Sequence, residues 1–267
     1  AAFPQDYYAN FFSAASRSSP PAASGAARDR LVPRAGSAWR IRAGRDGDIW
    51  QYAVRHQRID PGFNPEIGFV PRPDAIFSDG FIAWRPRPDD SPVRQFTFLY
   101  NPLYITDTDG NLETRDNLFV METNFQSGDL LGASYEEPFE RITEDFAFYP
   151  GVIDVVVPAG DYPMQQGSIY LNTFQGRRFW SNLVALAGSF YGGHKSTLTW
   201  GLMAKFSPHF SVESRYEWDR VRIPGGDFDV NLWVTRFNVA ISPNLFGSAL
   251  VQVDDIDDNI DLNLRVD

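Results

Sequence analysis

The sequence contains no cysteine among its 267 residues, so disulfides, thiolate metal sites and cysteine nucleophiles are all excluded. It also lacks any apolar run of about 18 residues, which argues against a transmembrane helix. A membrane β-barrel is compatible with this absence, because its strands alternate apolar and polar residues and score weakly on hydropathy. Basic residues are in the minority, with 24 Lys and Arg against 34 Asp and Glu, and the formal charge of −10 argues against nucleic acid as a partner.

Histidine is scarce as well, and the three histidines lie on separate segments without the spacing of a metal site: His56, His194 and His209. The nucleophile-elbow, zinc-protease and phosphate-loop motifs are also missing from the sequence. We therefore expect no metal, no cofactor and no enzymatic activity.

Aromatic residues, in contrast, make up 15% of the chain, and such side chains suit half-buried sheets and membrane interfaces. Apolar and polar residues alternate in many short segments, which is the period of a β-strand, and no amphipathic pattern extends beyond about three helical turns. We expect an all-β fold: an antiparallel up-and-down β-barrel of the outer-membrane type, whole or partial, with about a dozen strands. The clearest segments are 39–43, 50–55, 81–85, 96–100, 119–125, 197–206, 210–219, 232–241, 245–253 and 260–266.

The domain organisation follows from composition. Residues 1–37 include a Ser/Ala/Pro-rich tract and are predicted to be a low-complexity segment or loop, whereas 38–267 form the barrel domain. Residues 136–165 are expected to be a long loop with a short strand at 153–157. Short turns at 207–209 and 242–244 alternate with longer acidic loops at 223–227 and 254–259, an asymmetry typical of outer-membrane barrels.

A dense charged row is the main candidate binding site, at the lumen or rim of the barrel. In a membrane barrel such a row faces a wet lumen and its opposite charges pair, whereas in a sandwich it faces solvent. Alternation alone does not choose between the two, but strands of about ten residues with aromatic ends favour the membrane. The row consists of Glu213, Arg215, Glu217 and Asp219.

Other acidic residues allow alternative interpretations. Residues 107–111 partly resemble a calcium loop, but an Asx/Gly turn is the favoured interpretation. The acidic stretch 254–258 is interpreted as a solvated loop in preference to a cation site. Glu213, Glu217 and Asp219, with Arg215, could imitate the paired carboxylates of a glycosidase, since alternate residues of a strand lie about 7 Å apart, although lumen charges explain them more simply.

The segment 59–72, IDPGFNPEIGFVPR, resembles the FNPEVGF-x-x-R signature of an uncharacterised bacterial family. Members of that family usually carry an N-terminal domain similar to family 9 carbohydrate-binding modules, followed by a large β-barrel assigned to the outer membrane. Further matching pieces follow in the same order, including VPAGDY at 157–162, GSFYGG at 188–193 and SPNLF at 242–246. The residues that carry the signature are Phe63, Asn64, Pro65, Glu66, Gly68, Phe69 and Arg72. They are expected to form a structural turn in which Glu66 pairs with Arg72.

The resemblance implies a non-enzymatic, porin-like barrel in the bacterial outer membrane, in contact with its lipid. Its role would be surface binding or passage of solutes, including glycans by analogy with the carbohydrate-binding domain. Two alternatives stay open: a soluble all-β subunit that binds carbohydrate or another protein chain, and a carbohydrate-active enzyme that uses the strand carboxylates.

Overall fold

The computed structural model describes residues 7–16, 36–65, 70, 72–148, 153, 155–242, 245–255 and 259–266. All regular structure in these ranges is β, which confirms the predicted antiparallel all-β class. The strands form a 16-stranded sheet and a separate two-stranded sheet, and neither closes on itself within the described residues. In the same ranges, no helix has the length and hydropathy needed to span a bilayer.

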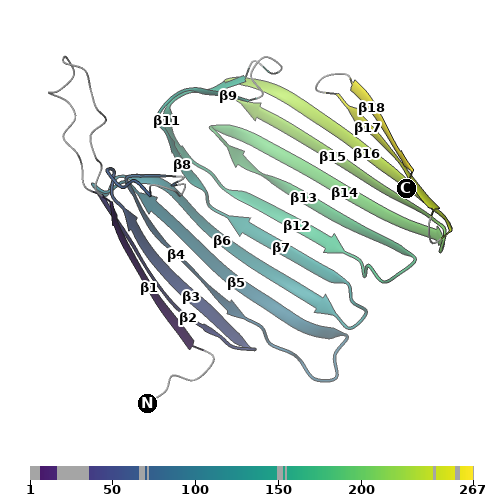
Figure 1. Cartoon of the computed structure of the whole chain (residues 1–267), viewed down its shortest axis with the longest axis horizontal. Coiled ribbons are helices and arrows are strands. Elements are labelled where there is room, and N and C mark those ends of the chain that lie inside the picture. The colour runs from purple at the N-terminus through teal and green to yellow at the C-terminus, as the bar shows by residue number, and fades with distance from the viewer. Residues whose placement is uncertain are drawn as a thin grey trace. The chain divides into compact units, whose positions relative to one another are not determined.

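The large sheet is a meander in which most strands pair with their neighbours in sequence (Figure 1). Its main path runs β1-β2-β3-β4-β5-β6-β7-β12-β13-β14-β15-β16-β17-β18. The bounds of the strands in the first half of the chain are β1 (Tyr7–Ser16), β2 (Gly36–Asp46), β3 (Trp50–Ile59), β4 (Ala75–Trp84), β5 (Val93–Thr106), β6 (Leu112–Phe125), β7 (Leu130–Glu136), β8 (Phe139–Ile142) and β9 (Phe146–Phe148). Those in the second half are β10 (Val155–Val157), β11 (Gly160–Pro163), β12 (Gln166–Asn172), β13 (Phe179–Phe190), β14 (Gly193–Ser207), β15 (Phe210–Ile223), β16 (Gly226–Ser242), β17 (Leu245–Asp254) and β18 (Asn259–Val266).

The chain divides into two compact units, each of which is described by itself. The first comprises Ala1–Arg85, Leu99–Leu118 and Phe139–Arg141, and it contains β1 to β4 with parts of β5 and β6. The second comprises Pro86–Phe98, Phe119–Pro138 and Ile142–Asp267, and it contains the long strands β13 to β16.

Every segment with clear alternation lies in or overlaps a strand, but three predicted loops differ from the structure, within 1–37, within 136–165 and at 223–227. Residues Tyr7–Ser16, expected to be low-complexity loop, form β1 and pair with β2 over their whole length. The Ser/Ala/Pro tract of the same segment lies outside the described residues. Within 136–165, the expected short strand is present as β10, but β8, β9 and β11 also form there.

The predicted acidic loop at 223–227 is wrong. β15 continues to Ile223 and β16 starts at Gly226, so only Pro224 and Gly225 turn the chain. Gly226 has φ +142°, a conformation that suits glycine and allows so tight a connection. The one acidic residue of this segment, Asp227, is therefore a paired strand residue that lies opposite Arg222. At the other end of these strands, the expected short turn after Ser207 is confirmed.

Candidate functional site

The candidate charged row lies along β15, with all four side chains on one face, because alternate residues of a strand point the same way. We call this face of β14 to β18 the charged face and the opposite one the apolar face. Arg215 Nη2 lies 2.9 Å from Glu217 Oε2, and Lys195 Nζ of β14 lies 3.3 Å from Asp219 Oδ1. The expected pairing of opposite charges is thus present both along β15 and across strands.

Neighbouring strands supply further polar residues to the charged face. Glu213 lies directly opposite Arg236 of β16, which the sequence prediction did not include. One step closer to the turn at 208–209, a polar row crosses five strands in direct register. It consists of Lys205, Ser211, Asn238, Ser248 and Arg265.

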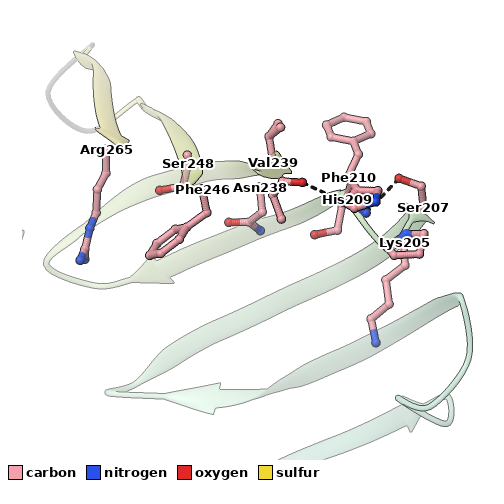
Figure 2. A pocket seen from close by; sticks show the side chains of 13 residues that line it. Lys205, Ser207, His209, Phe210, Asn238, Val239, Phe246, Ser248 and Arg265 are labelled. Atoms are coloured by element: carbon pink, nitrogen blue, oxygen red, sulfur yellow. Dashed lines mark hydrogen bonds between the residues drawn. The ribbon is translucent and has the colours of Figure 1, made fainter. Parts of the chain in front are cut away.

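A pocket of about 480 Å³ is lined by this polar row and by Phe246. Figure 2 shows Lys205, Phe246 and Arg265 directed to one side of the sheet, while Phe210 points to the other. Here two cationic side chains, amide and hydroxyl groups and an exposed aromatic ring converge at the end of the charged row. Such a combination can hold a polar solute with an apolar face.

The sequence prediction found the charged row but missed the pocket. Lys205 and Arg265 are separated by 60 positions, and only the register of four strand pairs brings them into one row. Turn length alone would not have found the row, because the two-residue turn pairs Ser207 with Phe210 and a register irregularity between Lys205 and Ser207 then places Lys205 opposite Ser211. A second irregularity, between Ala240 and Ser242, shifts the register of β16 and β17 in the same way.

The apolar face of the same strands carries two rows of aromatic residues. At the 208–209 end, Phe206 stacks on Phe210 with ring centroids 5.5 Å apart and meets Phe179 at 6.0 Å. The second row lies six residues along and contains Trp200, Tyr216 and Trp233 in direct register. Six residues of strand span about 20 Å, so the two rows border an apolar band of that length.

Each aromatic residue of the second row donates a hydrogen bond from its ring N–H or hydroxyl group. Trp200 Nε1 donates to Ser181 at 3.0 Å, Trp233 Nε1 donates to Ser214 at 2.9 Å, and the Tyr216 hydroxyl donates to Asn231 at 2.6 Å. Beyond this row, towards Pro224, the same face becomes charged. Arg220 and Arg222 of β15 pair there with Asp227 and Asp229 of β16, at 3.0 to 3.5 Å.

A hairpin of β9 and β10 packs against the 224–225 end of the charged face. Val157, only 1% exposed, joins Val155 in a cluster with Val221 and Ile223, which continue the charged row of β15. Phe148 and Phe228 pack against this cluster from the side, with ring centroids 5.6 Å apart. A Cβ at Gly225 would lie 1.9 Å from the Val156 carbonyl oxygen, so the close approach of hairpin and turn requires glycine at Gly225.

The signature segment is only partly described. Glu66, Gly68 and Phe69 lie outside the described residues, so the predicted Glu66–Arg72 pair is untested. Arg72 donates to Thr114 at 3.2 Å and its Nη2 lies 2.7 Å from Glu113 Oε2. These contacts fix the end of the segment to β6.

The start of the signature segment is anchored by Asp60. Its carboxylate accepts hydrogen bonds from the Ser37 hydroxyl at 2.6 Å and from Arg58 Nε at 2.8 Å, which lower the pKa of Asp60. The Asp60 carbonyl accepts from Phe63 N, and this turn leads through Asn64 and Pro65. The described part of the segment thus has the features of a structural turn.

The two other acidic segments were interpreted as a turn and a solvated loop. Asp107 accepts from the backbone N–H groups of Asp109 and Asn111, at 3.0 and 2.8 Å, and Gly110 has φ +91°. The Asx/Gly turn is therefore confirmed. In the acidic stretch 254–258, Asp255 accepts from Asn231 N at 2.6 Å, while residues 256–258 lie outside the described ranges. In the part of the chain that the structure describes, no cluster of three acidic or histidine side chains could hold a metal ion.

The turn 126–129 and the loop 173–178 are joined by Asp129. It accepts from Phe174 N at 2.9 Å, from the Ser127 hydroxyl at 2.7 Å and from Arg177 Nη2 at 2.8 Å. The Arg177 guanidinium and the other donors hold the pKa of Asp129 well below its usual range.

Asp129 should therefore make stability fall in acid. Its contribution is complete above the ordinary aspartate pKa of 3.8 and is lost as the pH falls through the lower pKa of the folded protein. We expect the melting temperature to drop less between pH 5 and pH 2 in Asp129→Asn than in the parent chain. Asp89→Asn, at an exposed carboxylate that makes no hydrogen bond with any residue the structure describes, is the matched control for melting followed by tryptophan fluorescence. Equal pH dependence in parent and Asp129→Asn would contradict the coupling.

Comparison with known proteins adds no assignment. A scan against models of known protein families finds no match, and a search of curated proteins finds none either.

Proposed function

We propose that this chain is a non-enzymatic, outer-membrane-type β-barrel, or a large part of one, that binds or passes polar solutes along its charged face. The observation that carries the proposal is the apolar face of β13 to β16. Its two aromatic rows lie about 20 Å apart along the strands and border exposed apolar side chains, as aromatic girdles border the apolar band of outer-membrane barrels.

The two faces of these strands have opposite characters, as a membrane barrel requires. Trp233, Phe237 and Val239 of β16 are each about 40 to 50% exposed on the apolar face. The charged face carries ion pairs and the polar row, which suit a water-filled interior. Lipid of the bacterial outer membrane would then cover the apolar face.

Solutes with several hydroxyl groups fit the pocket at Lys205 and Arg265. Amide, hydroxyl and cationic groups can bond sugar hydroxyls, while the Phe246 ring can pack on the apolar face of a sugar ring. Glycans are therefore the class of solute that we propose for the charged face.

The proposal requires that both edge strands of the sheet be paired in the membrane. β1 and β18 each pair with one neighbour on the sheet, and an unpaired edge in lipid leaves backbone groups unsatisfied. This requirement is met if β1 and β18 pair within the chain, or if each of them pairs with a further chain segment.

Heat-modifiability of the chain tests the proposal. The chain should require detergent for extraction, and unboiled protein should migrate differently from boiled protein on SDS gels, because a closed barrel resists SDS until heated. The same protein unfolded in urea before loading is the control and should migrate as the boiled sample does. A monomer that is soluble without detergent and shows no shift would contradict the proposal and favour a soluble binding subunit.

A further inference from the structure

β18 forms an edge of the large sheet (Figure 1). It pairs antiparallel with β17 on one side and with no other strand that the structure describes. Natural sheets commonly protect such an edge with a proline, a bulge or a very short strand. β18 has eight residues, contains neither proline nor glycine, and keeps an unbroken register with β17. The outer side of β18 is therefore available to another strand.

The apolar side chains of β18 are strongly exposed. Four of them are 63 to 75% exposed, more than any other large apolar side chain that the structure describes in the second unit. A side chain on an edge strand has a cross-strand neighbour on one side only, so part of its apolar surface stays in contact with the surroundings. A further strand beside β18 would cover part of that surface. The four residues are Ile260, Leu262, Leu264 and Val266.

The charged face of β18 carries one acidic and one basic residue, Asp261 and Arg265, with Asn263 midway between them. On β17, the residues directly opposite the two charged ones are the uncharged Gln252 and Ser248. Neither charge thus has an opposite charge directly across from it on β17. A strand on the outer side of β18 can supply both.

The sequence of β18 is complementary to itself. When two copies of β18 pair antiparallel with Asn263 opposite Asn263, Asp261 of each copy lies opposite Arg265 of the other. A slip of two residues places Asp261 or Arg265 opposite Asn263 and removes both ion pairs, and a slip of one places apolar side chains opposite polar ones. In the complementary register the apolar side chains also meet each other, Ile260 with Val266 and Leu262 with Leu264.

We propose that β18 binds β18 of a second copy of this chain, antiparallel and with the two Asn263 residues opposite each other. Charge complementarity selects this partner, because opposite charges directly across an antiparallel pair stabilise it and like charges destabilise it. The two-fold axis of the pair is perpendicular to the sheet, so the apolar faces of the two copies adjoin and so do their charged faces. The inference goes beyond the proposed function and does not rest on it, because strand pairing of this kind needs neither lipid nor solute.

Disulfide cross-linking tests the pairing, and the absence of cysteine from the chain makes every cross-link assignable. Asn263→Cys places two sulfurs on directly opposite residues, whose Cα atoms lie about 4.5–5.5 Å apart in an antiparallel pair and so within reach of a disulfide. After oxidation with copper phenanthroline, most of the folded, purified variant should migrate as a dimer on non-reducing SDS gels. Asn172→Cys is the matched control: Asn172 is also exposed, but its strand β12 is paired on both sides, so this variant should stay monomeric.

Exchange of charges tests the register. Asp261→Arg alone and Arg265→Asp alone each place like charges opposite each other in the two copies. Each should weaken dimerisation about tenfold, as measured by sedimentation equilibrium of the folded chain. A mixture of the two variants restores opposite charges in both pairs and should dimerise as the parent chain does. A purely structural role of either residue would not give this recovery.

Two results would overturn the inference. The first is that Asn263→Cys cross-links no more than Asn172→Cys, which would mean that another segment covers this edge of the sheet. The second is that the mixed charge variants associate no better than either variant alone. Heat-modifiability of the same samples separates this inference from the proposed function. A heat-modifiable monomer overturns only this inference, whereas a dimer that needs no detergent and shows no shift overturns only the proposed function.

Discussion

Leu202→Arg should prevent stable insertion of the chain into lipid bilayers. Leu202 lies on the apolar face of β14, between Phe206 in one aromatic row and Trp200 in the other. An arginine at the middle of a barrel's lipid-facing band costs about 2–4 kcal/mol of folding free energy. We expect this variant to fold into vesicles at a much lower yield than the parent chain, as measured by the fraction of heat-modifiable protein after refolding.

Met203→Arg is the matched control for Leu202→Arg. Met203 is the next residue of β14 and lies on the charged face, directly opposite Glu213, so an arginine there gains a partner. We expect its refolding yield to stay near that of the parent chain. If both variants insert equally well, the apolar face does not contact lipid. If both fail equally, an arginine anywhere on this part of β14 prevents insertion, whichever face it lies on.

Val157→Asp should release the hairpin of β9 and β10 from the charged face. Val157 is 1% exposed within the cluster that includes Val221 and Ile223, and that cluster offers no cation to a buried carboxylate. An unpaired buried charge is costly enough to favour undocking. We expect limited proteolysis to cleave within 143–159 in this variant while the large sheet stays folded.

Val156→Asp is the matched control for Val157→Asp. It tests whether the hairpin is released only when the buried Val157 side chain is replaced or whenever a negative charge is placed in β10. Val156 is 42% exposed and points away from the cluster, so the aspartate carboxylate of this variant stays in solvent. Protease resistance of 143–159 should match the parent chain. In liposomes, the undocked hairpin of Val157→Asp should also raise the rate of solute uptake, because the hairpin covers one end of the charged face. Equal cleavage of both variants would contradict this account.

The sequence predicted strands well wherever one face differs strongly from the other. The alternation from Leu198 to Phe206 and from Phe210 to Trp218 places the same residues in β14 and β15 as the structure does. It failed at 223–227, which was predicted to be an acidic loop. In the structure the one acidic residue of this segment, Asp227, faces Arg222 across a two-residue turn, and composition cannot distinguish a solvated carboxylate from one paired across a hairpin.

The candidate site was predictable only along a single strand. Glu213, Arg215, Glu217 and Asp219 share a face by periodicity alone, so the row could be found without knowing any neighbour. The polar row at Lys205 depends on register between strands, and a register error of one residue in any strand pair moves the following strand's side chains to the opposite face. The docking of Val157 depends on contacts between segments far apart in sequence, and no local pattern encodes it.

The meander also has a consequence for how such a chain is made. Each strand from β13 to β18 pairs with the strand that precedes it in sequence, so each new strand can add to an existing edge with little loop-closure entropy. Synthesis from the N-terminus would leave a single growing edge at any moment. The polypeptide could therefore be lengthened or shortened by whole hairpins at this edge without disturbing the earlier pairings.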